Sequence, residues 1–150
     1  MIDFVSVRSN MAGTFGGHAM SLPLHHMIAS GPRPVAPFSH AVEADGWVFV
    51  TGQMPTDPAA PEAPLPAGIV AQTRRVLDNL QIVLGGIGLG FEHVVMARIY
   101  LTEFKRDYKA MNEVYVGYFT PGKLPARTTI GVTALAVDAL VEIDLVVRRP

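Results

Sequence analysis

The chain of 150 residues contains no cysteine. Without thiols it can form neither disulfides nor thiolate metal sites, and a cysteine nucleophile is excluded. Charged residues are scarce, at 17%, and nearly balanced, with a formal net charge of −1. Binding to phosphate backbones requires a basic patch, and the chain offers only short basic pairs such as Arg74-Arg75. We therefore expect no nucleic-acid partner.

Long apolar runs are also missing from the sequence. Charges, prolines or glycines interrupt every stretch before it reaches the 18 or more apolar residues of a membrane span. The N-terminus shows no positively charged segment followed by an apolar one, so no secretory signal is predicted. These absences predict a cytoplasmic protein without a membrane partner.

Motifs of the common hydrolases and metalloenzymes are absent as well. The histidines show neither the His-Glu-x-x-His nor the His-x-His spacing of a metal site, and no Gly-x-Ser-x-Gly elbow occurs. The glycine-rich segment 85–90 follows a predicted helix and precedes a predicted strand, which is the reverse of the order in a dinucleotide-binding turn. We interpret it as a helix end, and no metal site is predicted.

Hydrophobic residues make up 49% of the chain and fall into short alternating segments and two helical ones. Residues 68–84 and 107–119 repeat apolar side chains every three or four positions, as amphipathic helices do. Strands are predicted over residues 38–42, 47–53, 93–101, 124–132 and 141–145. The resulting order, β-β-α-β-α-β-β, predicts an α+β fold. Two helices can cover one face of the sheet, so the other apolar face requires another subunit.

Residues 1–29 show no sustained period and contain three further methionines, so the natural start can lie inside them. We interpret them as an N-terminal extension, partly flexible, in front of a domain that spans residues 30–150. Segment 24–28 is nevertheless compatible with an edge strand. Gly52, near the end of strand 47–53, predicts either a bulge or a close approach of another group to the backbone.

The best site candidates lie on strands 124–132 and 141–145. On each strand the aliphatic and β-branched residues alternate with polar ones, which places Arg127 and Glu142 opposite the apolar side chains of their strands. If both apolar faces contact one core, Arg127 and Glu142 emerge on the same sheet face. A guanidinium there can bind a small carboxylate through its planar fork of donors. The same pattern also fits an ordinary cross-strand ion pair.

Seven short motifs, spread over most of the chain, are similar to motifs of one protein family. Residues 36–41 correspond to the motif Gly-Pro-Tyr-Ser-Gln-Ala that is usual in this family, and residues 48–53 correspond to its motif Val-Phe-Val-Ser-Gly-Gln. Further motifs follow at residues 72–79, 100–102, 111–115, 125–129 and 141–144. In this order, from about residue 30 to residue 148, they resemble the reactive intermediate deaminase (RidA/YjgF) family, also labelled endoribonuclease L-PSP.

The resemblance implies a chorismate-mutase-like fold, with a mixed sheet covered on one face by two helices, that assembles as a homotrimer with sites between subunits. It also implies hydrolysis of 2-imino acids and their enamine tautomers to 2-keto acids and ammonia, without metal or organic cofactor. In that reaction Arg127 would bind the substrate carboxylate and Glu142 would orient and deprotonate the attacking water. Gly52 and Asn112 are placed at the same site by the resemblance.

Three residues depart from the family pattern. Phe38 replaces the usual tyrosine and keeps the ring without its hydroxyl, Thr129 stands where many members carry cysteine, and His40 replaces glutamine. Phe38 and Thr129 remain candidate substrate-binding residues. The departures leave open a pathway-specific deaminase, for example of an aminomuconate-like substrate, and a trimer that binds small carboxylates without turnover. A ribonuclease is disfavoured by the near-neutral charge and by the absence of a paired histidine site.

Overall fold

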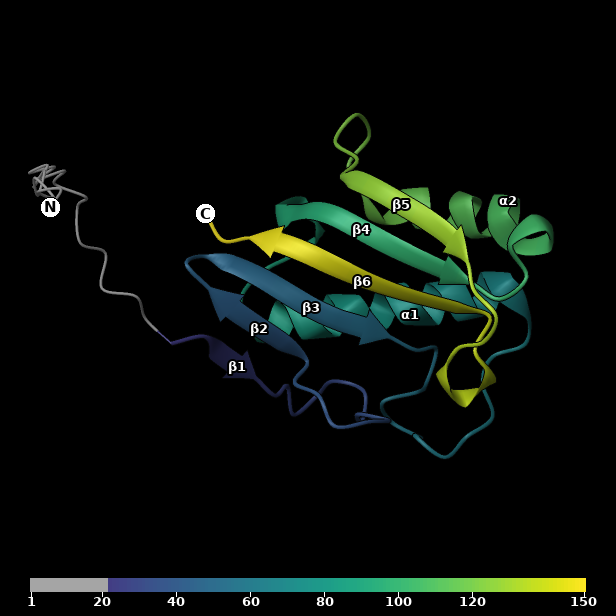
Figure 1. The fold of residues 1–150 in the computed structure, drawn as a ribbon, viewed down its shortest axis with the longest axis horizontal. Helices are drawn as coiled ribbons and strands as arrows, with labels where there is room; N and C mark the ends of the chain where they lie inside the picture. Colours follow the sequence, from purple (N-terminus) through teal and green to yellow (C-terminus); the bar gives the residue numbers. More distant parts are fainter. Residues whose placement is uncertain (1–21) are drawn as a thin grey trace, which may run out of the picture.

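The computed structural model describes residues 22–150. Within that range six strands form one sheet in the order β1-β2-β3-β6-β4-β5 (Figure 1). The strands are β1 (Leu24–His26), β2 (Ala41–Ala44), β3 (Trp47–Gln53), β4 (Val94–Leu101), β5 (Ala126–Gly131) and β6 (Val141–Arg148). Strands β4 and β5 pair in parallel and the other pairs are antiparallel, so the sheet is mixed.

Two helices, α1 (Gly68–Gly86) and α2 (Phe104–Tyr115), lie behind the sheet in Figure 1 and cover one of its faces. The apolar stripe of α1 includes Leu77 and Leu80, which are completely buried against sheet residues such as Ile143. This arrangement confirms the predicted α+β fold with both helices on one side. Neither helix in residues 22–150 has the length and apolar composition needed to cross a membrane.

The boundaries of some elements differ from those predicted. Helix α2 begins at Phe104 and continues after Tyr115 as a short 3₁₀ turn. Strand β2 begins at Ala41, after a segment in which Pro34 and Pro37 have no N–H to donate to a sheet ladder. The predicted hairpin at Asp45-Gly46 is confirmed, with both residues at positive φ, as a tight turn of this type requires.

The N-terminal part of the described chain belongs to the sheet. Strand β1 pairs with β2 at the sheet edge, as segment 24–28 had suggested. The Ile28 N–H then donates to Nδ1 of buried His40 (2.9 Å), and His40 Nε2 donates to the Pro32 carbonyl (2.8 Å). His40 thereby fixes the backbone on both sides of Gly31. The prediction for residues 1–21 lies outside the described residues.

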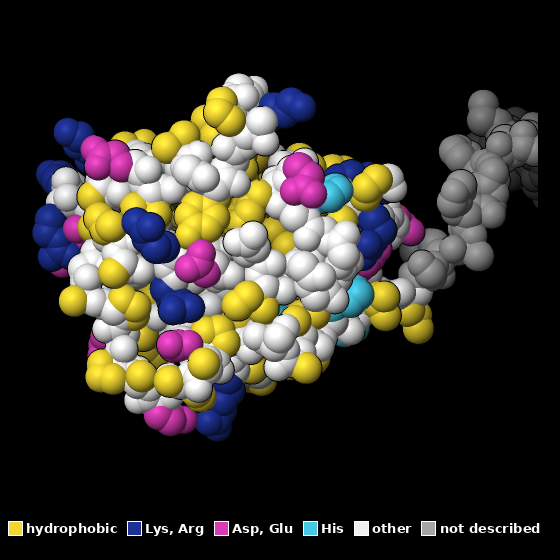
Figure 2. Space-filling view, turned by 180° about the vertical axis from the view of Figure 1, so that it is seen from behind, with side chains coloured by type: hydrophobic (Ala, Val, Ile, Leu, Met, Phe, Trp, Pro, Cys, Tyr) yellow, Lys and Arg dark blue, Asp and Glu magenta, His cyan; other side chains and the backbone are white. Residues whose placement is uncertain are grey.

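The two faces of the sheet differ in what they expose. The covered face buries Ala97, Ile99 and Ile143 completely. The opposite face, which we call the open face, carries Trp47 and Phe49, which are 40% and 50% exposed. Seen from the helix side, the surface mixes basic, acidic and apolar side chains without a broad field of one charge (Figure 2).

Candidate functional site

Arg127 lies at the sheet edge and turns toward α2. It is paired with Ala97 of the neighbouring strand, and paired residues of two strands project from the same face. The covered face therefore holds the Arg127 side chain. Its Nη1 donates to the side-chain oxygen Oδ1 of Asn112 (2.5 Å) and its Nη2 to the Tyr108 hydroxyl (3.4 Å).

Two tyrosine rings complete the cradle of this guanidinium. Arg127 Cζ lies 5.0 Å from the ring centroid of Tyr115 and 6.0 Å from that of Tyr108. A cation over an aromatic face is stabilised by the ring quadrupole. The guanidinium is thus held in one orientation before any ligand arrives.

Two buried hydroxyl groups near Arg127 lack hydrogen-bond partners within residues 22–150. They belong to Thr129, two residues along the same strand face, and to Tyr115. An unsatisfied buried polar group costs roughly 1–3 kcal/mol. Burial raises the pKa of Tyr115 to about 12, so its hydroxyl remains protonated at neutral pH. Such groups are suited to an incoming anion.

A hollow of about 330 Å³ lies beside these groups. It is lined by Asn112, Tyr115, Val116, Leu124, Pro125 and Arg127. We call Arg127, Asn112, Tyr115 and Thr129 the arginine half-site. Its one cation and its neutral donors suit a small carboxylate.

Glu142 lies on the open face. It is paired with Tyr100 of β4, which is paired in turn with Ile130 of β5, and Ile130 is 45% exposed. The Glu142 carboxylate lies directly against Gly52, where an added Cβ would collide with it. The β3–β6 pairing breaks between Val50 and Gln53, so Gly52 sits in a bulge. Both predictions for Gly52, a bulge and a close approach, are confirmed.

The electrostatic surroundings of Glu142 favour its protonated form. Burial raises the pKa of the Glu142 carboxyl, and the negative charge of Asp144 on the same face raises it further. Asp144 is itself fixed by Arg98 Nε (2.7 Å) and the Tyr100 hydroxyl (3.0 Å). Phe38 and Gly52 line one small crevice beside this carboxylate. We call Glu142, Gly52 and Phe38 the glutamate half-site.

The prediction that Arg127 and Glu142 share a sheet face was wrong. It assumed that Thr128 and Ile130 contact the core, but β5 is an edge strand whose Ile130 side chain lies on the open face. Arg127 and Thr129 face the helix side instead. Strand β4 also separates β5 from β6, so the alternative of a cross-strand ion pair is not realised either. One chain brings together the members of each half-site, but not the two half-sites.

Sequence reasoning missed Tyr108 and Tyr115 as neighbours of Arg127. Both lie in the amphipathic segment predicted over residues 107–119, where they were given no role at the site. The signal was present, because Tyr108, Asn112 and Tyr115 are spaced by four and three residues and therefore share one helix face. Asn112, which the resemblance assigned to the site, contacts Arg127 in the structure, and its role in binding substrate stays a prediction.

The fold and these side chains define a small α+β protein whose sheet edge carries an arginine fixed by Asn112 and two tyrosine rings. Residues 28–149 match the family described as Endoribonuclease L-PSP, and the chain belongs to this family. This confirms the RidA/YjgF resemblance found in the sequence.

Relatives and solved structures agree with this assignment. The chain is 44% identical over 117 residues to Protein DfrA of Myxococcus xanthus, covering 77% of this chain and 87% of that protein. It is 34% identical over 115 residues to the 2-iminobutanoate/2-iminopropanoate deaminase of Mus musculus, covering 77% and 83%. Crystal structures of RidA from an Antarctic Psychrobacter species (29% identity, covering 83% and 98%) and of the Escherichia coli YjgF product (26%, covering 85% and 99%) each give a TM-score of 0.77.

Proposed function

We propose that the protein hydrolyses reactive 2-imino acids and their enamine tautomers to 2-keto acids and ammonia. Family membership and the similarity to the Mus musculus deaminase support a deaminase-like hydrolase. The observation that carries the proposal is the arginine half-site, in which Arg127 is fixed by Asn112 beside buried hydroxyls that have no partner in residues 22–150. A 2-imino acid has the carboxylate that such a site requires.

The two half-sites supply the reason for an assembly of several copies. They lie on opposite faces of one sheet, so a substrate that contacts both must lie between two chains. The open face also exposes Trp47, Phe49 and Ile130, which a neighbouring subunit would cover. We infer a homotrimer in which the arginine half-site of one subunit meets the glutamate half-site of the next.

In the proposed reaction the arginine half-site holds the substrate by its carboxylate. Arg127 donates to the carboxylate oxygens, while Asn112 keeps the guanidinium plane in place. The Thr129 hydroxyl, which has no partner among the described residues, donates a further hydrogen bond to the same group. The imine carbon is thereby presented to the neighbouring glutamate half-site.

Glu142 then acts as general base. It removes a proton from water as the oxygen attacks the imine carbon, and the C=N electron pair moves to nitrogen, which takes up a proton. The amino group of the resulting aminol takes up the proton lost from the hydroxyl group, relayed by Glu142, as the C–N bond breaks, so that ammonia leaves and the 2-keto acid remains. The raised pKa of Glu142 makes it a stronger base than an ordinary carboxylate. Gly52 lets the Glu142 carboxylate lie against the backbone of β3, and the Phe38 ring forms a wall.

The test measures ammonia release while an amino-acid oxidase generates 2-iminobutanoate in situ. The wild type should accelerate release, and Arg127→Ala should lower kcat/KM by about a hundredfold or more, because the imine carbon is no longer positioned. Arg127→Lys, which keeps the charge and loses the planar fork, should lie between the two. Sedimentation checks that each variant still assembles. Wild-type turnover by Arg127→Ala would refute the assigned role.

Binding without turnover is the second candidate. The arginine half-site is complete within one chain, so it can hold a carboxylate whether or not Glu142 from another copy is in reach. Calorimetry with 2-oxobutanoate would then show Arg127-dependent binding, while no imine is hydrolysed faster than in buffer.

A further inference from the structure

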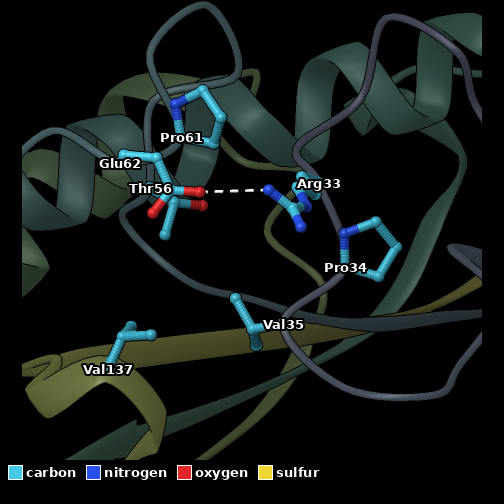
Figure 3. Close-up of a pocket in the computed structure, with 7 residues that line it drawn as sticks. All are labelled: Arg33, Pro34, Val35, Thr56, Pro61, Glu62 and Val137. Atoms are coloured by element: carbon cyan, nitrogen blue, oxygen red, sulfur yellow. Dashed lines mark hydrogen bonds and ion pairs between the residues drawn. The ribbon is translucent and has the colours of Figure 1, made fainter.

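A crevice beside the glutamate half-site has no part in the reaction described above. Its volume is about 260 Å³. Figure 3 shows one wall formed by consecutive residues 33–35 and another by residues from the segment between β3 and α1. The full lining is Arg33, Pro34, Val35, Thr56, Pro61, Glu62 and Val137.

The crevice continues toward the reacting groups. The smaller hollow that contains Phe38 and Gly52 is also lined by Arg33, Val35 and Thr56, so the two spaces share a boundary. The smaller hollow measures only about 10 Å³, so a substrate whose imine carbon lies beside Gly52 adjoins the crevice rather than reaching it through an open channel. The crevice itself, at about 260 Å³, has room for a short side chain.

Hydrogen bonds from buried side chains hold the backbone of both crevice walls in place. Buried Asn79 on α1 donates to the carbonyl oxygens of Met54 (2.9 Å) and Thr56 (2.8 Å). On the other wall, His40 holds the Pro32 carbonyl directly before Arg33. The backbone on both sides is thus anchored to the core, which keeps the opening between them constant.

Arg33 is the cation of this crevice. Its Nη1 donates to Glu62 Oε1 across the opening (3.0 Å; Figure 3), and within residues 22–150 its other guanidinium nitrogens make no hydrogen bond. The two side chains are 72% and 86% exposed, and an ion pair so exposed contributes little. A ligand carboxylate can replace Glu62 or bind the unused donors at low cost. The neighbouring prolines and valines offer no competing polar side chain.

We propose that this crevice receives the substrate side chain and that Arg33 selects 2-imino acids with a second, distal carboxylate, such as 2-iminoglutarate. This inference rests on the proposed imine hydrolysis, since it places the imine carbon at the glutamate half-site. Arg127 binds the carboxylate next to the imine, and Arg33 binds the one at the far end. Glu62 acts against the preference, because it competes for Arg33 and repels the ligand.

The test is the ratio of kcat/KM for 2-iminoglutarate to kcat/KM for 2-iminobutanoate, each generated in situ by an oxidase. Arg33→Ala should lower the ratio by roughly two- to fivefold, the effect of losing one exposed ion-pair contact. Glu62→Gln should raise it. Arg75→Ala removes the same charge from a different hollow, on α1, and should leave the ratio unchanged. An unaltered ratio in Arg33→Ala overturns the inference.

A binding measurement separates this inference from the proposed function. Calorimetry compares 2-oxoglutarate with 2-oxobutanoate, neither of which requires turnover. If no imine is hydrolysed but Arg33→Ala weakens 2-oxoglutarate selectively, the hydrolase proposal fails and the crevice assignment stands. If 2-imino acids with an uncharged side chain are hydrolysed, and Arg33→Ala binds both keto acids with the same affinity as the wild type, the crevice assignment alone fails.

Discussion

The two faces of the sheet differ in burial and in the charged groups that they carry. The covered face buries residues such as Ile99 and Ile143 under two helices and is complete within one chain. The open face exposes Trp47 and Phe49 and carries Glu142, a carboxylate whose pKa is raised by its surroundings. The core of the covered face stabilises the fold, and the edge of this face carries the arginine half-site. The open face keeps apolar surface and a carboxylate in unfavourable electrostatic surroundings, which do not stabilise a single chain and which the proposed assembly and catalysis would use.

The sharpest test of this comparison is Glu142→Gln, for which we expect the largest effect. Removing a general base lowers kcat by roughly 10²–10⁴-fold. The fold should not suffer. Because the folded-state pKa of Glu142 is raised, folding stability falls as pH rises from the ordinary value of 4.5 through that raised pKa, and the cost persists at neutral pH. The uncharged amide introduced by Glu142→Gln removes this loss of folding stability.

Calorimetric melting at two pH values provides the measurement. At pH 7 the Glu142→Gln variant should melt above the wild type, and below pH 4 the difference should vanish because Glu142 is protonated in both states. A variant that melts well below the wild type at pH 7 would show that the carboxylate stabilises the fold, and the contrast between the two faces would be lost.

The second prediction compares one apolar residue from each side. Leu80→Ala empties a completely buried position on α1 and should lower the free energy of unfolding by about 2–5 kcal/mol. Phe49→Ala removes a ring that is half exposed on the open face, so it should weaken the proposed trimer instead. Denaturation of each variant at several protein concentrations distinguishes the two. Equal, concentration-independent losses for both variants would contradict the division of roles.

The fold followed from the sequence wherever one local signal dominated. The Asp45-Gly46 turn fixed a hairpin, and the apolar period of residues 68–84 placed a helix that the structure confirms. Gly52 indicated a bulge because a glycine within a strand leaves space that another group fills, here the Glu142 carboxylate. Each of these signals depends on residues close to one another in the chain.

The site was less predictable, because its geometry depends on strand order. The alternation of apolar and polar residues shows which side chains share a face of a strand, but it does not show which face meets the helices. On a central strand such as β6 the fully apolar face settles this choice. On the edge strand β5, Ile130 is exposed and Arg127 turns inward to the rings of Tyr108 and Tyr115, so hydrophobicity pointed to the wrong face. Only the parallel pairing with β4 resolves it.

The smallest expected effect concerns Asp144, whose charge contributes to the raised pKa of Glu142. In the proposed mechanism Glu142 must be deprotonated, so kcat/KM falls as pH drops through the pKa of Glu142, which lies above the ordinary value of 4.5. Asp144→Asn removes the neighbouring negative charge, while its amide oxygen can still accept from Arg98 and its NH2 group can donate to the Tyr100 hydroxyl. The acid limb of the pH profile should therefore move to lower pH, with the plateau largely retained. Glu113→Gln, which neutralises a carboxylate in the groove between the helices, is the matched control and should leave the limb in place. If the limb stays fixed in Asp144→Asn, the group that titrates is not Glu142, and the open face does not supply the base.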